Sequence, residues 1–365
     1  MKIKFKNPLP GIIRWIKQHY IMLLICLGIT GIVGGSLYLL HSDINKRTEG
    51  KGVEINIPEV VIHHLADSYD WHFATWNDTH LTIHLPVIIR SNATGEWHIC
   101  TTQTLPEGFY LDENHHDKVY EKMPDGTSER PLDLSITKLV AQLMLTVILL
   151  LVLFLSCARW YKKRDETSAA PSGIVGVMEM LVMYIHDDVI RPNVGEHQYK
   201  KYAGFLLTLF FFIFTTNLLG LIPGAANVTG NINVTLFLAL CTMLAINLFG
   251  NKLYWKDIFN PHVPWWLKFP IPLMPAIELF GIISKPFALM IRLFANMMAG
   301  HAVMLSFTCV IFFGTTLGVI GGEAMNLFSI VMLLFMYALE VLVAFVQAYV
   351  FTLLSSVFIG LAHVE

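Results

Sequence analysis

Two long apolar stretches near the C-terminus carry ionisable residues where a hydrocarbon environment would disfavour charge. Residues 276–313 contain Arg292, and residues 324–362 contain Glu340. An arginine stays charged at any accessible pH, so a buried one needs a counter-ion. Charged side chains within a membrane are costly, and they commonly mark ion pathways or proton relays. These two residues therefore predict a proton-handling site inside a membrane.

Helical geometry groups the other polar residues of 276–313. At about 100° per residue, three polar residues lie within about 40° of Arg292: Glu278, Lys285 and Asn296. Three small residues lie within about 60° of the same line: Ala288, Ala295 and Ala299. Small residues let another helix approach closely, so we expect the arginine face to contact protein. His301 points about 180° away, and we expect it to serve a different path.

A second polar stripe runs along 324–362. Asn326, Glu340 and Gln347 share one face, because their spacings of 14 and seven residues are near whole turns. Ordinary hydrogen bonding between helices explains Asn326 and Gln347 as well as a channel does. No carboxylate lies three or four residues from Arg292, so its counter-ion must come from elsewhere in the fold or from another chain.

Composition sets the class of protein. The 365 residues are 55% hydrophobic and 14% charged, and the mean hydropathy is +0.57. These values exclude an ordinary soluble enzyme, a disordered chain and a nucleic-acid binder. A net charge of −2 provides no basic field for polyanions. We expect an all-α integral membrane protein whose solvent is largely lipid.

The apolar runs predict about six membrane helices. They lie at 21–40, 139–158, 202–222, 233–250, 276–313 and 324–362. At about 1.5 Å per residue the last two would approach 60 Å, twice the hydrocarbon thickness, so we expect both to be strongly tilted. Residues 174–189 have helical apolar spacing and predict one amphipathic interfacial helix that Pro192 ends.

Charge asymmetry predicts the orientation. Residues 1–20 hold five Lys/Arg and no acid, which places the N-terminus in the cytoplasm. The segment 41–138, with 16 acidic and eight basic residues, then lies outside, and six crossings return the C-terminus to the cytoplasm. Residues 1–40 are an anchor or a signal, 41–138 an outer segment and 139–365 the membrane core.

The outer segment is expected to be a small cap. Residues 71–76 and 81–89 predict two short strands. Nine of the 15 histidines fall in 41–138, but their spacing shows no four-ligand pattern, so no metal or cofactor is expected.

One string in the core resembles a known family. Residues 284–301, SKPFALMIRLFANMMAGH, look like the arginine motif of subunit a of F-type ATP synthases. Residues 216–223 and 231–235 resemble two further motifs of that family in the same order. The spacings also match: Glu278 stands 14 residues before Arg292, and Glu340 stands seven before Gln347.

The resemblance implies the stator half of a proton turbine in a bacterial inner membrane. Its partners would be a c-subunit ring, a b-subunit peripheral stalk and, through them, the soluble ATPase head. Arg292 would face the ring carboxylate, Glu340 and His301 would relay protons in the outside half-channel, and Glu278 would serve the inside one. The remaining lining residues would be Asn296, Gln347, Ser284, Lys285 and Asn326.

Two other classes compete with this interpretation. A proton-coupled secondary transporter usually shows internal repeats, and none is visible here. An intramembrane hydrolase would need a nucleophile and base, but H-E-x-x-H and G-x-S-x-G are both absent. No P-loop is present, so we expect a non-catalytic subunit without its own ATP site.

Overall fold

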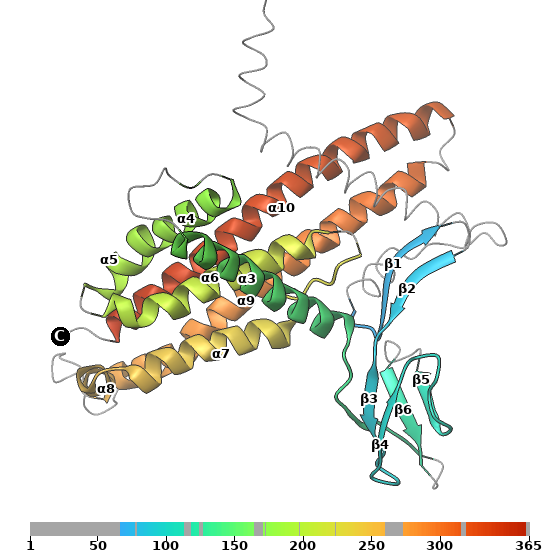
Figure 1. Cartoon of the computed structure of the whole chain (residues 1–365), viewed down its shortest axis with the longest axis horizontal. Helices are drawn as coiled ribbons and strands as arrows, with labels where there is room; N and C mark the ends of the chain where they lie inside the picture. The colour runs from blue at the N-terminus through green and yellow to red at the C-terminus, as the bar shows by residue number, and fades with distance from the viewer. Residues whose placement is uncertain are drawn as a thin grey trace, which may run out of the picture.

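The computed structural model describes residues 66–362 apart from 77–78, 113–117, 124–126, 164–170, 172, 197, 223, 260–272 and 315–318. The predicted first span, 21–40, and the beginning of the outer segment lie outside the described residues. Two parts follow each other along the described chain, a set of short strands and then a bundle of long helices (Figure 1).

Five of the predicted apolar runs are helices in the structure. Their bounds are α3 Lys138–Lys162, α6 Tyr199–Gly220, α7 Ile232–Phe249, α9 Leu273–Gly314 and α10 Val319–Leu361. A short helix, α8 Lys252–Phe259, follows α7. Within the described residues, three helices are long and apolar enough to cross a membrane: Lys138–Lys162, Tyr199–Gly220 and Met325–Leu361. The prediction of a helical membrane protein is therefore confirmed.

The two longest helices form an antiparallel pair. α9 has 42 residues and α10 has 43, and they lie side by side along most of their length (Figure 1). At about 1.5 Å per residue each exceeds 60 Å. Pro286 lies inside α9, where it removes one backbone hydrogen bond.

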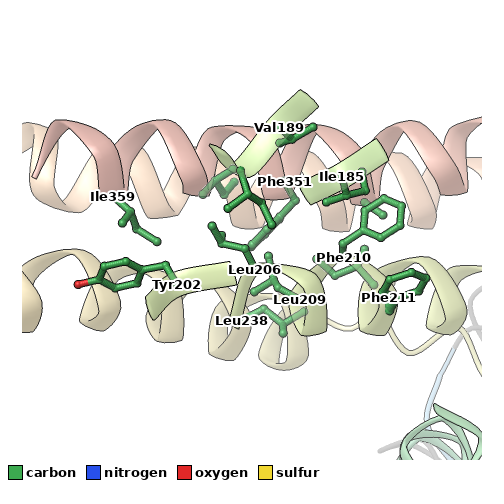
Figure 2. Packing of buried hydrophobic residues seen from close by; sticks show 14 of the residues in the cluster. Ile185, Val189, Tyr202, Leu206, Leu209, Phe210, Phe211, Leu238, Phe351 and Ile359 are labelled. Atoms are coloured by element: carbon green, nitrogen blue, oxygen red, sulfur yellow. The ribbon is translucent and has the colours of Figure 1, made fainter. Parts of the chain in front are cut away.

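The bundle core lies where α6 packs against α10 and α7. Figure 2 shows Leu206 and Phe210 of α6 facing Phe351 of α10, with Leu238 of α7 on the opposite side of α6. Leu206 and Phe210 are fully buried, so the core fixes α6 against the α9–α10 pair.

The predicted amphipathic helix differs from its expected form. The chain forms α4 Ile174–Tyr184, a π-helical turn η2 Ile185–Ile190 and α5 Arg191–Val194 without a break. The prediction that Pro192 ends the helix is wrong. Pro192 lies in the first turn of α5, where a missing N–H is tolerated. Ile185 and Val189 are fully buried, so this part of the segment packs into the core.

The outer part has more strands than the sequence predicts. They are β1 Asp70–Trp76, β2 Thr79–His84, β3 Val87–Arg90, β4 Trp97–Cys100, β5 Phe109–Asp112, β6 Lys118–Lys122, β7 Ser128–Glu129 and β8 Leu132–Asp133. β1 and β2 pair as a hairpin, and two three-stranded sheets have the orders β4-β3-β8 and β5-β6-β7. The single predicted strand 81–89 is wrong, because Leu85 and Pro86 divide it into β2 and β3 of different sheets.

Backbone hydrogen bonds attach the strands to the bundle. The Lys138 amide at the start of α3 donates to the Ser68 carbonyl at 3.0 Å, and the Ile136 amide donates to the Pro86 carbonyl at 3.1 Å. The Trp71 indole donates to the Gly224 carbonyl at 2.7 Å, in the connection between α6 and α7. The sheets are therefore held at one end of the helices.

Candidate functional site

Glu340 of α10 lies against Gly300 of α9. The Glu340 side chain is 3% exposed. A Cβ atom built at residue 300 would overlap the Glu340 carboxylate, so an alanine here would require that side chain to shift. The carboxylate oxygen Oε2 is buried and has no hydrogen-bond partner among the described residues. An unpaired carboxyl oxygen at this depth is suited to binding a proton or a water molecule.

Unpartnered oxygens recur along α10. Within the described chain, all four buried side-chain oxygens without a hydrogen-bond partner belong to this helix: Asn326 Oδ1, Ser329 Oγ, Glu340 Oε2 and Thr352 Oγ1. A buried polar group without a partner costs about 1–3 kcal/mol, which a bound water offsets. Ser329 was not among the residues predicted for the site. It lies 11 residues before Glu340, close to three whole turns, so the spacing alone places it on the same face as Glu340.

His301 bridges α9 and α6. Its Nε2 lies 2.9 Å from the Gly220 carbonyl oxygen, and its Nδ1 lies 3.1 Å from the Met297 carbonyl oxygen. Both neighbours can only accept, and a neutral imidazole has a single N–H to donate. Both hydrogen bonds form only when the ring carries two protons, so the setting suits a group that gains and loses a proton. No direct hydrogen bond joins His301 to Glu340 among the described atoms.

A buried polar network surrounds the end of α6. The Thr229 hydroxyl donates to Asn217 Oδ1 at 2.7 Å, and Asn217 Nδ2 donates to the Ala344 carbonyl at 3.4 Å. Asn227 Nδ2 donates to the Met297 carbonyl at 3.1 Å, the same oxygen that His301 contacts. These polar side chains link α6, the following turn, α9 and α10 around His301. Asn217, Asn227 and Thr229 were not among the predicted site residues, although Asn217 lies within the motif 216–223.

Arg292 lies on the outer surface of the α9–α10 pair. Four of the six residues predicted to share its face are exposed with it: Ala288, Ala295, Asn296 and Ala299. The other two, Glu278 and Lys285, are only partly exposed. Leu289 and Leu293, about 60° and 100° around the helix from Arg292, are buried. In the described part of the chain, no hydrogen bond or ion pair engages the Arg292 guanidinium. Arg292 is therefore a permanent cation on a surface of small side chains, where an acidic group of another chain can approach it closely.

Polar groups lie on both sides of Arg292 along α9. Glu278 precedes it by 14 residues, or about 21 Å of helix, and His301 follows it by nine, or about 13 Å. Glu278, Ser284 and Lys285 are all partly exposed. Between the two groups the buried side of α9 is apolar. The arrangement provides two separate polar regions with a fixed cation between them.

A small cavity opens near the first of these regions. It has a volume of about 20 Å³ and is lined by residues of α7, α8, α9 and α10, among them Asn247, Tyr254 and Lys285. Lys285 Nζ lies 5.5 Å from the centroid of the Phe358 ring. This volume is enough for about one water molecule.

The structure separates the remaining predicted site residues. Gln347 is buried two turns from Glu340 on α10, facing the same side. Asn326 lies four turns away from Glu340 toward the opposite end of that helix. The structure thus brings Glu340 next to the α9 backbone beside His301, and it leaves Arg292 and Asn296 on the exposed side of α9.

The helical core is similar to proteins of one known family. A family model described as ATP synthase A chain matches residues 142–360. The chain belongs to this family. The chain is 40% identical over 236 residues to the ATP synthase subunit a of Chloroherpeton thalassium, covering 63% of this chain and 67% of the relative. It is 45% identical over 236 residues to the ATP synthase subunit a 2 of Chlorobaculum tepidum, covering 63% and 64%.

A longer match extends beyond the core helices. The ATP synthase subunit a 2 of Chlorobium luteolum is 37% identical over 310 residues, covering 83% of this chain and 75% of the relative. A second family model, described only as a domain of unknown function, matches residues 60–134. The helices of the core thus belong to an integral membrane family, and the strands lie within the segment that the second model matches.

Proposed function

We propose that the chain is the stator proton-channel subunit of an F-type ATP synthase. It provides two aqueous half-channels and a fixed arginine opposite the rotating c ring. The observation that carries the proposal is the setting of Arg292, which lies without a partner among the described residues on an exposed face of small side chains, between two polar regions. Family membership agrees with this assignment.

The outside half-channel uses Glu340 and His301. Glu340 receives a proton through the water-binding oxygens of α10, with Asn326 and Gln347 along the same helix. His301, whose two nitrogens both face carbonyl oxygens, accepts and returns protons beside it. A carboxylate on the neighbouring ring subunit then receives the proton, and Asn296 lines this transfer on the Arg292 face.

The inside half-channel uses the other end of α9. Glu278 receives the released proton, and Ser284 and Lys285 line the path with it. Arg292 separates the two channels, because its charge opposes the passage of a proton along the surface of α9. It also stabilises the ring carboxylate in its deprotonated form while the two face each other.

The proposed partners and location follow from this role. The c ring contacts the Arg292 face, the b-subunit stalk holds the chain against rotation, and both connect to the soluble ATPase head. The chain lies in a bacterial inner membrane with 41–138 in the periplasm and the C-terminus in the cytoplasm. Residues 1–40 anchor the chain or direct its export, and 139–365 form the membrane core.

The test is Arg292→Ala in complexes reconstituted into vesicles, with ATP synthesis driven by an imposed proton gradient. The proposal predicts loss of synthesis with the subunits still assembled. Ile291→Ala is the matched control, since Ile291 is an exposed neighbour on α9 about 100° away. Wild-type synthesis in Arg292→Ala would overturn the proposal, and so would equal losses in both variants.

A further inference from the structure

One face of the β4-β3-β8 sheet carries a continuous set of apolar side chains. In antiparallel strands, directly opposed residues share a face. Ile88 opposes Ile99, and Arg90 opposes both Trp97 and Leu132. We call the face that carries these five residues and Leu134 the open face. The other face carries Val87 and Ile89, which are fully buried against the β5-β6-β7 sheet.

The open face is exposed to a degree that a soluble domain would rarely tolerate. Ile99 is 77% exposed, Leu134 is 61% exposed, and Trp97 and Leu132 are each about half exposed. Single exposed apolar residues are ordinary, but a contiguous group on one sheet marks a contact surface. Among the described residues, nothing covers this group.

The open face continues into the surface of a membrane helix. The Leu134 amide donates to the Ile88 carbonyl at 2.9 Å, so the chain stays on the sheet until it is four residues from α3. The first turns of α3 expose Val140 and Met144. Apolar surface therefore runs from the sheet onto the side of α3 that faces away from the bundle.

The sheet lies past the ends of α3 and α7 and extends to one side of them (Figure 1). In Figure 1, β3 and β4 project sideways beyond α3 and α7, and they lie on the bundle side of β5 and β6. Hydrogen bonds from Lys138 and Ile136 hold this position at the end of α3. The lipid around α3 would fill the space next to the sheet on that side.

We propose that the open face rests on the outer leaflet of the membrane. Tryptophan is favoured at the boundary between headgroups and acyl chains, where Trp97 would lie. Ile99, Leu132 and Leu134 would reach the upper acyl region. This contact is independent of the proton path.

Arg90 gives the contact a polar component. Its guanidinium carbon lies 6.0 Å from the centroid of the Trp97 ring, and its Nε donates to the Gly95 carbonyl at 3.1 Å. The remaining N–H groups of this fixed guanidinium are suited to phosphate oxygens. A headgroup layer provides phosphate beside apolar chains, which matches the composition of the face.

Spin-label accessibility in the intact complex tests the proposal. The five native cysteines are replaced by serine, and a nitroxide is attached at Ile99→Cys or, as control, at Glu129→Cys. Glu129 is exposed on β7 of the opposite sheet. Complexes are reconstituted into phosphatidylcholine and phosphatidylglycerol vesicles. Collision rates with oxygen, which concentrates in lipid, and with a water-soluble nickel chelate are then compared.

The oxygen-to-nickel ratio is expected to be several-fold higher at position 99 than at position 129. A ratio at 99 equal to that at 129 would show a water-exposed face and overturn the proposal. Low accessibility of position 99 to both reagents would show a protein cover, such as a second copy of the chain, and would also overturn it. ATP synthesis by the same labelled complexes reports separately on the proton path.

Discussion

The Glu340 carboxylate occupies the space that a side chain at Gly300 would fill. This relationship brings an acid of α10 into contact with the backbone of α9, one residue from His301. The acid is thereby held between the two helices, and its Oε2 atom has no hydrogen-bond partner among the described residues. We expect its position to be sensitive to a change of one methyl group on the facing helix.

Gly300→Ala should impair both packing and proton transfer. The added Cβ overlaps the carboxylate, so either the side chain or the helices must shift. Forcing extra atoms into a packed interior costs about 1–3 kcal/mol. Thermal stability and proton pumping in vesicles measure the two effects.

Gly281→Ala is the matched control for that change. A Cβ at residue 281 meets only Lys285 Cε at 3.8 Å, an ordinary contact on the same helix. Alanine favours a helix over glycine by about 1 kcal/mol, so this variant should be as stable as wild type or more so. Shortening the acid with Glu340→Asp should partly restore Gly300→Ala, and failure of that rescue would contradict the steric explanation.

Glu340→Gln should slow proton flux while leaving the complex assembled. Glutamine keeps the shape of glutamate but cannot carry the proton that a relay must load and release. Proton pumping by membrane vesicles checks the flux, and copurification of the other subunits checks assembly. Unchanged pumping would exclude a relay role for Glu340.

Exchanging the two relay residues should preserve more activity than either single change. His301→Glu and Glu340→His each leave two like groups, whereas the double variant restores one imidazole and one carboxyl group. Rates of gradient-driven ATP synthesis in the three variants give the comparison. A double variant no better than the worse single variant would show that the positions are not interchangeable.

The outer part should lose stability in acid through Asp133. Burial raises the pKa of Asp133, but hydrogen bonds from Ser135 and Tyr69 outweigh this effect and hold it below the usual value. A carboxyl whose pKa is lowered by folding contributes stability above its unfolded pKa of about 4, and this is lost as the pH falls through the lower folded pKa. This loss of stability should appear as faster hydrogen exchange of β3 and β8 in the full chain as the pH is lowered from neutral to acid.

Tyr69→Phe isolates that contribution. It removes one hydrogen bond to the carboxylate and should lower the stability of the strands at neutral pH by about 1–3 kcal/mol. The difference from wild type should shrink below about pH 4, because the protonated acid no longer gains from the bond. A difference that stays constant with pH would assign the effect to packing of the Tyr69 ring.

The helices could be predicted from the sequence because length and hydropathy determine them locally. The five apolar runs from residue 139 onward match helices to within about five residues at each end. The shared face of Arg292 with Asn296 also followed from periodicity alone. The opposite orientation of His301 followed in the same way, and its contact with Gly220 of α6 agrees with it.

Contacts between distant segments could not be predicted from periodicity. The fit of Glu340 against Gly300 depends on the register of α9 and α10, which spacing within one helix does not specify. The network of Asn217 and Thr229 depends on a turn that returns to the end of α6. The extra strands of the outer part are only two to five residues long, too short to show a clear alternation.

The Arg292 face, which has no partner among the described residues, has a consequence for biogenesis. A newly inserted copy of this chain would present a permanent cation to lipid, at a cost of at least about 2.5 kcal/mol. Docking against carboxylates of another chain removes that cost, so the unassembled subunit is the less stable species by mass action. Orphan copies should therefore be preferred substrates for membrane quality-control proteolysis, and the order of assembly becomes a question of which chain neutralises Arg292 first.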